Sequence, residues 1–331
     1  MTLETRHYSP GLRAILIGIV IGVLYLSSLW FGFNEAERRS VTLEIPAEGA
    51  DHIAIDVDVV LVDLVRSEMT ARISLHLAGK LAQDAVTPAV DLELVLNAIR
   101  GQQQFDFPKG KRINPIEAVF PLDGDVNLYP FDQHKGILWL FATIAGGQQA
   151  PSGSKPAQPA TVIPDELPRS AGLPVSASTL EKRVQADTRA KFTASIPGLT
   201  FRGSRSVQSV EALKGLTGIE VNLTRSGYVV FISVTAMAMM LALALGLVAM
   251  VLKVVYTNRN MAAFQVPMAV SLIFGLPALR NVQPGIPPPG TFGDLVAFTW
   301  AEIAAAASAV ALIAHWILHR MHGKPPPAKK T

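Results

Sequence analysis

Long stretches without charged residues lie at both ends of this chain, and about 190 more polar residues separate them. No charged side chain occurs in residues 14–34, 226–252 or 260–279, and residues 295–318 contain only Glu302 and His315 as ionisable groups. A helix needs about 20 mainly apolar residues to cross a bilayer, and it satisfies its own backbone hydrogen bonds there. The pattern therefore predicts four transmembrane helices over these ranges, the last three forming a bundle within residues 226–318.

The middle segment, residues 35–225, has the pattern of a β domain. Apolar and polar residues alternate in 52–59, 72–77 and 91–96, as they do in half-buried strands. Residues 136–144 form a nearly continuous apolar run, which suits a central strand. Further strand-like pieces follow at 185–196, 199–205 and 218–223. The expected fold class combines transmembrane α-helices with an all-β domain. This domain is expected to be an antiparallel β-sandwich that lies between the N-terminal anchor helix and the C-terminal three-helix bundle. Two small subdomains are the alternative.

Two irregular segments interrupt these strands. Asp123, Gly124 and Asp125 are typical of a turn. Residues 146–174 are rich in Gly, Pro, Ser, Gln and Ala and lose the apolar periodicity, so they are expected to form a flexible excursion from the sandwich.

The basic residues indicate the orientation of the spans. Arg6 and Arg13 precede the first apolar stretch, and no small-residue cleavage pattern follows it, so an uncleaved anchor is expected. Basic residues gather in 1–13, between the second and third spans, and in the tail 319–331. By the positive-inside rule both termini are cytoplasmic, and residues 35–225 lie outside the cytoplasmic membrane of the cell.

Composition agrees with a membrane protein. Half of the residues are hydrophobic, 17% are charged, and the mean hydropathy is +0.33. The net charge of +3 gives no reason to expect nucleic acid as a partner. The chain has no cysteine, which excludes disulfides, thiolate metal sites and cysteine nucleophiles. No cofactor, metal or catalytic motif is recognised.

The segment from Tyr129 to His134, of sequence Tyr-Pro-Phe-Asp-Gln-His, is the first candidate functional element. Pro130 fixes its φ and removes a hydrogen-bond donor, which favours an ordered turn before the apolar run at 136. Asp132 can accept backbone hydrogen bonds across such a turn.

Glu302 and Arg280 are the second candidate pair. Glu302 lies within the last span, where a carboxylate is costly unless it is paired, hydrated or protonated. It is either a proton or cation site, or a helix contact partnered by Arg280 of the outer loop. Asp294 is expected to cap the last span. The turn and the outer loop are expected to touch through Asp132 and Arg280, with Glu302 competing for the same arginine.

The last span also carries Ala301, Ala305 and Ala309 at four-residue spacing. Small residues at this spacing allow close approach of helix backbones. They predict the face on which this helix packs against the other spans.

The whole chain resembles an uncharacterised actinobacterial family of integral membrane proteins, defined by a domain of unknown function. The residues that carry the resemblance are 129–134, 279–288 and 298–302. The family brings no established activity. Locally, Tyr129 to Asp132 is similar to the aromatic-Pro-aromatic-Asp turn of pentameric ligand-gated channels, which also join an extracellular β-sandwich to membrane helices. Three predicted spans follow the β domain here, and those channels have four.

Three classes of function remain open. In the first, the exported sandwich binds or organises an envelope component or a partner membrane protein, which includes a second copy of the chain. In the second, the protein is an ion channel or transporter that uses Glu302. In the third, it is a membrane enzyme acting on lipid-linked substrates, with Glu302 and Asp132 as acids. The lipid bilayer is a partner in each case.

Overall fold

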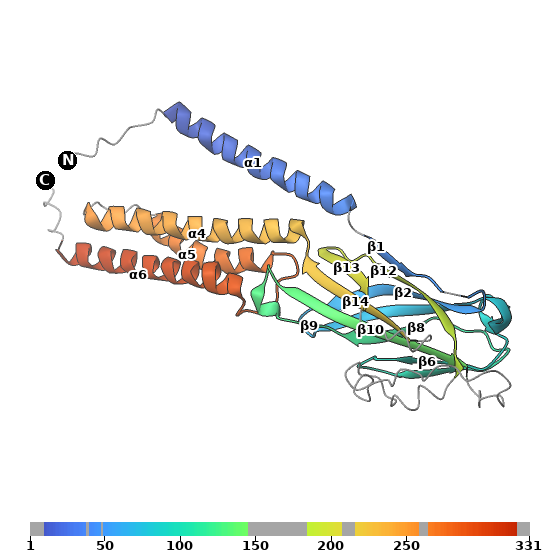
Figure 1. Cartoon of the computed structure of the whole chain (residues 1–331). Helices are drawn as coiled ribbons and strands as arrows, with labels where there is room; N and C mark the ends of the chain where they lie inside the picture. The colour runs from blue at the N-terminus through green and yellow to red at the C-terminus, as the bar shows by residue number, and fades with distance from the viewer. Residues whose placement is uncertain are drawn as a thin grey trace, which may run out of the picture. The chain divides into compact units, whose positions relative to one another are not determined.

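The computed structural model describes residues 10–37, 40–47, 49–144, 184–206, 216–257 and 264–322. The chain forms two compact units, each assembled from separate parts of the sequence. The helical unit comprises Met1–Gly32, Asn127–Phe131 and Gly227–Thr331, and the β unit comprises Phe33–Val126 and Asp132–Ser226. Figure 1 shows the helices of the first unit and the strands of the second.

The helical unit contains α4 (Gly227–Tyr256), α5 (Gln265–Asn281), α6 (Thr299–His322) and most of α1 (Pro10–Glu37), whose last residues, from Phe33, belong to the β unit. Among the described residues, three segments are long and apolar enough to cross a membrane: Gly18–Glu35, Gly227–Tyr256 and Asp294–Leu318. The prediction of such helices at both ends of the chain is confirmed for these three. The 17 residues of α5 are about 26 Å long at 1.5 Å per residue, so the span predicted over 260–279 stays a prediction.

Helices α4, α5 and α6 pack side by side around one apolar core (Figure 1). Ala301, Ala305 and Ala309 of α6 are all buried there, which confirms the predicted packing face. Their small side chains bring the α6 backbone close to its neighbours, while larger residues of α4 and α5, such as Met240 and Leu276, fill the space between them.

The β unit contains two main sheets. The five-stranded sheet has the order β1-β12-β2-β3-β8, with strands Val41–Ile45, Asp187–Ala194, His52–Asp63, Glu68–Leu77 and Ile116–Pro121. The seven-stranded sheet has the path β13-β14-β10-β6-β7, with strands Leu199–Arg205, Leu216–Arg225, Gln133–Ile144, Leu92–Leu96 and Gln104–Phe107. Its remaining strands, β11 (Val184–Gln185) and β9 (Asp123–Gly124), pair with β10.

Smaller elements complete the β unit: the pair β4 (Ala82–Asp84) and β5 (Thr87–Pro88), and the 3-10 turn η1 (Gly79–Leu81). A second 3-10 turn, η2 (Val126–Leu128), leads out of it. All strand pairs are antiparallel except β12 with β2. The expectation of a β-rich, mostly antiparallel middle segment is therefore confirmed.

Residues of both sheets form one hydrophobic core. Ile55 and Ile73 of the five-stranded sheet belong to the same buried cluster as Leu94, Leu140 and Val221 of the seven-stranded sheet. Strands before and after residues 145–183 thus contribute to a single core. The excursion predicted at 146–174 lies outside the described residues.

Strand β10 is central, as the apolar run predicted, because it pairs with β14 on one side and β6 on the other. The turn predicted at Asp123 to Asp125 is wrong in part. Asp123 and Gly124 form strand β9, which pairs with Lys135 and His134 of β10. A Cβ at Gly124 would lie 2.4 Å from the His134 ring, so only glycine allows this close approach.

Candidate functional site

The segment Asn127–Phe131 belongs to the helical unit although strands of the β unit flank it on both sides. Tyr129 is completely buried, and its hydroxyl lies 2.6 Å from Ser233 Oγ on α4. The same hydroxyl donates to the carbonyl oxygen of Pro284 at 2.9 Å. The predicted contact between this turn and the outer loop of residues 280–294 is therefore present, and Tyr129 makes it.

The turn itself is ordered. Its Tyr129–Pro130 peptide bond is cis, and the Phe131 N–H donates to the Leu128 carbonyl at 2.8 Å. The phenyl ring of Phe131 is 54% exposed, so the two aromatic residues of the motif have opposite environments. Of these two aromatic residues, Tyr129 is the one that anchors the turn.

The β unit begins again at Asp132, which forms a buried cluster with His134 and Arg225. The Nε of Arg225 lies 3.0 and 3.1 Å from the two carboxylate oxygens of Asp132. His134 Nε2 lies 3.1 Å from Asp132 Oδ2. The strand register explains the cluster, because Gln133 of β10 pairs with Thr224 of β14, which places Asp132 and Arg225 next in line across the sheet. We call these three residues the Asp132 cluster.

The Asp132 cluster favours an ionised carboxylate. Burial acts to raise the pKa of Asp132, but the hydrogen bonds from His134 and Arg225, together with the arginine charge, outweigh it and hold the pKa below its usual range. His134 Nδ1 is buried and has no hydrogen-bond partner among the described residues. A single imidazole nitrogen therefore carries the contact with Asp132.

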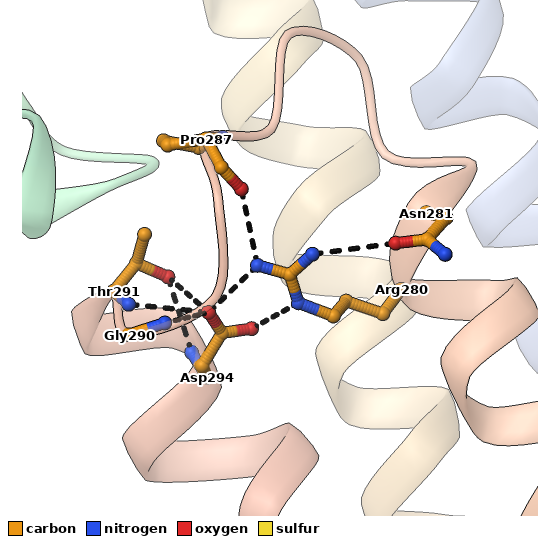
Figure 2. Close-up of polar contacts among 6 residues, drawn as sticks. All are labelled: Arg280, Asn281, Pro287, Gly290, Thr291 and Asp294. Atoms are coloured by element: carbon orange, nitrogen blue, oxygen red, sulfur yellow. Dashed lines mark hydrogen bonds and ion pairs between the residues drawn. The ribbon is translucent and has the colours of Figure 1, made fainter. Parts of the chain in front are cut away.

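Arg280 forms a second buried pair, inside the helical unit (Figure 2). Its Nε and one terminal nitrogen bind the two carboxylate oxygens of Asp294 at 2.5 and 2.8 Å. The guanidinium also donates to the Pro287 carbonyl at 3.1 Å and to Asn281 Oδ1 at 3.3 Å, and it lies over the Phe298 ring. Bidentate geometry of this kind fixes both side chains more tightly than a single contact does.

Asp294 is tied to the start of the last helix as well as to Arg280. Its Oδ2 accepts the N–H groups of Gly290 and Thr291, while its own N–H donates to Thr291 Oγ1. Thr291 is thus the N-cap and Asp294 the acidic residue three positions later, a capping-box arrangement. The expectation that Asp294 itself caps the helix is wrong by these three residues.

A π-helical turn, η3 (Asp294–Phe298), follows this cap. Such turns carry one extra residue per turn and are frequent at functional sites. Here the turn lies directly between the Arg280 contacts and the packing face that begins at Ala301.

Two of the expected pairings are wrong. Asp132 binds Arg225 and His134, and Arg280 binds Asp294, so the proposed Asp132–Arg280 contact has other partners on both sides. Glu302 does not share Arg280 either. Its Oε2 is buried without a hydrogen-bond partner in the part of the chain that the structure describes.

Sequence reasoning missed Ser233 and Arg225 entirely. The sequence position of Arg225 could have marked it as a candidate, because it is a single cation at the junction between the last strand and an uncharged helix. Its partner could be found only from the register of β10 and β14. The described residues contain no group of three histidine, aspartate or glutamate side chains placed to hold a metal ion.

Comparison with known families finds two matches, in separate parts of the chain. Residues 44–168 match the model of a domain of unknown function (DUF4436), and residues 225–319 match that of another domain of unknown function (DUF8686). The second match begins at Arg225 and includes Ser233, Arg280, Asp294 and Glu302. No curated protein matches the chain. These matches agree with a resemblance to an uncharacterised family.

Proposed function

We propose that the chain is an integral protein of the cell membrane whose β unit, a single sandwich outside the cytoplasm, binds or organises an envelope component or a partner membrane protein. The observation that carries this proposal is that buried charged side chains form ion pairs with one another. Arg225, Asp132, Arg280 and Asp294 each have side chains at most 7% exposed, and each arginine is closed on a carboxylate. Charges paired in this way hold structural elements together and are withdrawn from any substrate.

The membrane location has independent support. Three apolar helices are long enough to span, and Lys253 lies in the last turn of α4, at the end proposed to be cytoplasmic. With α1, α4, α5 and α6 crossing, both termini are inside and the β unit is outside.

Single cysteines test this orientation, because the natural chain has none. Lys111 in the β unit and Thr257 at the end of α4 are both exposed. In intact cells, a cysteine in the variant Lys111→Cys should react with a membrane-impermeant thiol reagent, and one in Thr257→Cys should react only after the cells are opened. The reverse result would contradict the proposal.

Partner binding is tested by photo-crosslinking from the β unit. Gln104 and Asp106 are exposed on β7, the last strand on its side of the seven-stranded sheet. A photoreactive residue at either position should give a reproducible crosslinked species in intact cells, and the same residue at Tyr256, 84% exposed on α4, should not give that species. Absence of any product from β7 and from Lys111 would count against a partner at these surfaces.

The structural role of the Arg280–Asp294 pair is tested by Asp294→Asn. Removing one partner of a buried ion pair should lower the free energy of unfolding by about 3–5 kcal/mol. The matched control is Glu117→Gln, which removes the acid of an exposed pair with Arg72 and should cost at most about 1 kcal/mol. Equal, small effects of the two substitutions would mean that the Arg280 pair does not hold the bundle.

A channel or transporter is the second candidate, because Glu302 Oε2 is buried without a partner among the described residues. A carboxylate at the centre of a membrane helix raises the free energy of insertion by about 2.5–3.5 kcal/mol, and a functional role would explain why it is retained. Purified protein in vesicles should show no proton or cation flux under the first proposal. Flux that is abolished by Glu302→Gln and retained in Glu220→Gln, a control in the β unit, would favour the second.

A further inference from the structure

Exposed apolar side chains gather at one end of the β unit. In its described residues the large hydrophobic side chains that are exposed are Phe33, Val60, Leu61, Val65 and Ile99. Three of them belong to the hairpin between β2 and β3, where Val60, Leu61 and Val65 are 47%, 59% and 53% exposed. We call residues 60–66 the hairpin tip.

The local structure holds these side chains outward. The register of β2 against β3 skips Val60, because Val59 pairs with Ala71 and Leu61 with Thr70. Such a bulge turns two consecutive side chains away from the core. The turn is fixed by Asp63, which accepts the N–H of Arg66 at 3.0 Å. The tip is thus an ordered surface and its exposure is built into the fold.

Polarity changes along the outer face of β2. The earlier outward positions hold the polar residues His52, Asp56 and Asp58 and one small residue, Ala54. The larger apolar residues Val60 and Leu61 follow them at the tip. If the hairpin tip were surrounded by water, polar residues would be expected at it, since the solvent-exposed face of a strand normally carries polar residues. The change from polar to apolar indicates that the environment changes along the strand.

The tip lies at the end of the β unit where the chain enters its apolar helices. Val59 and Val41 both register with Ala194, the last residue of β12, so β2 extends four residues beyond the first residue of β1. This extension is about 13 Å at about 3.3 Å per residue. The connection after β12 leads to Gly198, whose N–H donates to Glu35 in α1 at 3.1 Å.

Short connections join this end of the β unit to the helices along the chain. Only four residue steps separate Glu37 of α1 from Val41, and two separate Arg225 from Gly227 of α4. Their greatest lengths are about 14 Å and about 7 Å. The extension of the tip is comparable with these lengths, so a bilayer crossed by α1 and α4 would lie within reach of the tip.

We infer that the hairpin tip lies in the interfacial layer of the bilayer, with Val60, Leu61 and Val65 against the upper acyl chains and Arg66 at the lipid phosphates. The inference rests on the proposed function, because it requires α1 and α4 to cross that bilayer. Arg66 suits this position, since its side chain is 67% exposed beside the apolar residues. The hairpin would add a lipid contact that sets the tilt of the β unit on the membrane.

Spin labels on single cysteines test the inference in vesicles of phosphatidylethanolamine and phosphatidylglycerol. The label in Leu61→Cys should relax more with oxygen, which concentrates in lipid, than with a water-soluble nickel complex. Leu245→Cys on α4, 66% exposed, is the lipid reference, and Lys111→Cys is the water reference. A Leu61 label that behaves like the Lys111 label would overturn the inference and leave the proposed function intact.

The other outcomes are also decisive. If the Leu245 label behaves as in water, the proposed membrane crossing fails together with the inference. If the Leu61 label is shielded from both reagents, protein covers the tip, either a second copy or the helical unit, and the lipid contact is wrong. As a second variant, Val60→Ser with Leu61→Ser should move a label at Val65 toward the water reference, and no movement would contradict the insertion.

Discussion

Tyr129 shows how one buried hydroxyl joins segments that are distant in sequence. Its partners are 104 and 155 residues further along the chain, on α4 and in the loop after α5. Both contacts are made away from water, where an unmade hydrogen bond costs more than a made one contributes. The residue therefore acts through its hydroxyl as well as its ring.

Replacing this hydroxyl gives the first prediction. Tyr129→Phe leaves the ring in place but removes the hydroxyl that contacts Ser233 Oγ and the Pro284 carbonyl. The free energy of unfolding should therefore fall by about 1–3 kcal/mol. Tyr256→Phe makes the same chemical change at a site that is 84% exposed and should have little effect. Thermal unfolding of the detergent-solubilised protein measures both. Equal melting temperatures in the two variants would show that the hydroxyl contacts contribute nothing.

The Asp132 cluster predicts a dependence on pH. Because the pKa of Asp132 is lowered in the folded protein, its contribution is present above the unfolded pKa of about 3.9 and is lost as the pH falls through the folded value. Asp132→Asn should cost about 3–5 kcal/mol at neutral pH, because the buried charge of Arg225 loses the carboxylate with which it forms an ion pair. The difference between the variant and the natural chain should shrink below about pH 4.

The control for this titration is Asp58→Asn, which removes a carboxylate from an exposed position of β2. At neutral pH this substitution should change the free energy of unfolding by at most about 1 kcal/mol, because the position is exposed. If the pH profile of Asp132→Asn, measured by denaturant unfolding, ran parallel to that of the natural chain, another group would account for the loss of stability in acid.

At the scale of elements, the α6 helix combines a face of small residues with a π-helical start. The small residues were predictable because their spacing follows the helix period. The π-helical turn was not, since it depends on Asp294 being held by Arg280 and Thr291, which come from another helix and a loop.

Enlarging a residue on that face gives the third prediction. Ala305→Leu should lower the stability of the bundle by about 1–3 kcal/mol or more, because Ala305 is completely buried between helices. Ala306→Leu places the same side chain one position later, where the surface is exposed. Resistance of the solubilised protein to heat reports the difference. A tolerated Ala305→Leu would mean that the helices can separate at this point.

The strands also show which features can be predicted from the local sequence and which depend on residues that are far apart in the chain. Residues 199–205 were predicted as a strand-like piece from the local sequence, and β13 occupies that range. The parallel pairing of β12 with β2 and the Arg225 partner of Asp132 had no local signal. Both depend on which strands become neighbours, and that choice is made by the shared core of the two sheets.

The whole molecule consists of two units that are each discontinuous in sequence. Among the residues that the structure describes, those of the β core all lie within the β unit, which predicts that this core forms without the helices. The segment Asn127–Phe131, in contrast, belongs to the helical unit and lies between two parts of the β unit along the chain.

This division predicts the behaviour of a chain that ends at Ser226. Hydrogen exchange should remain slow in β2, β3 and β10, because their ladders and core are complete. The amide of Phe131, bonded to Leu128 in the turn, should exchange faster than in the full chain because Tyr129 has lost Ser233 and Pro284. Rapid exchange throughout the strands would show that the β unit depends on the helices after all.

The sequence distance between Tyr129 and its partners also sets a timetable for biosynthesis. A ribosome adding about 5–20 residues per second needs about 8–30 s to make the 155 residues from Tyr129 to Pro284. During that interval the turn has been made, but the Pro284 carbonyl that accepts its hydroxyl hydrogen bond has not. An early turn therefore gains one of its final contacts only after α4 and α5 have been made.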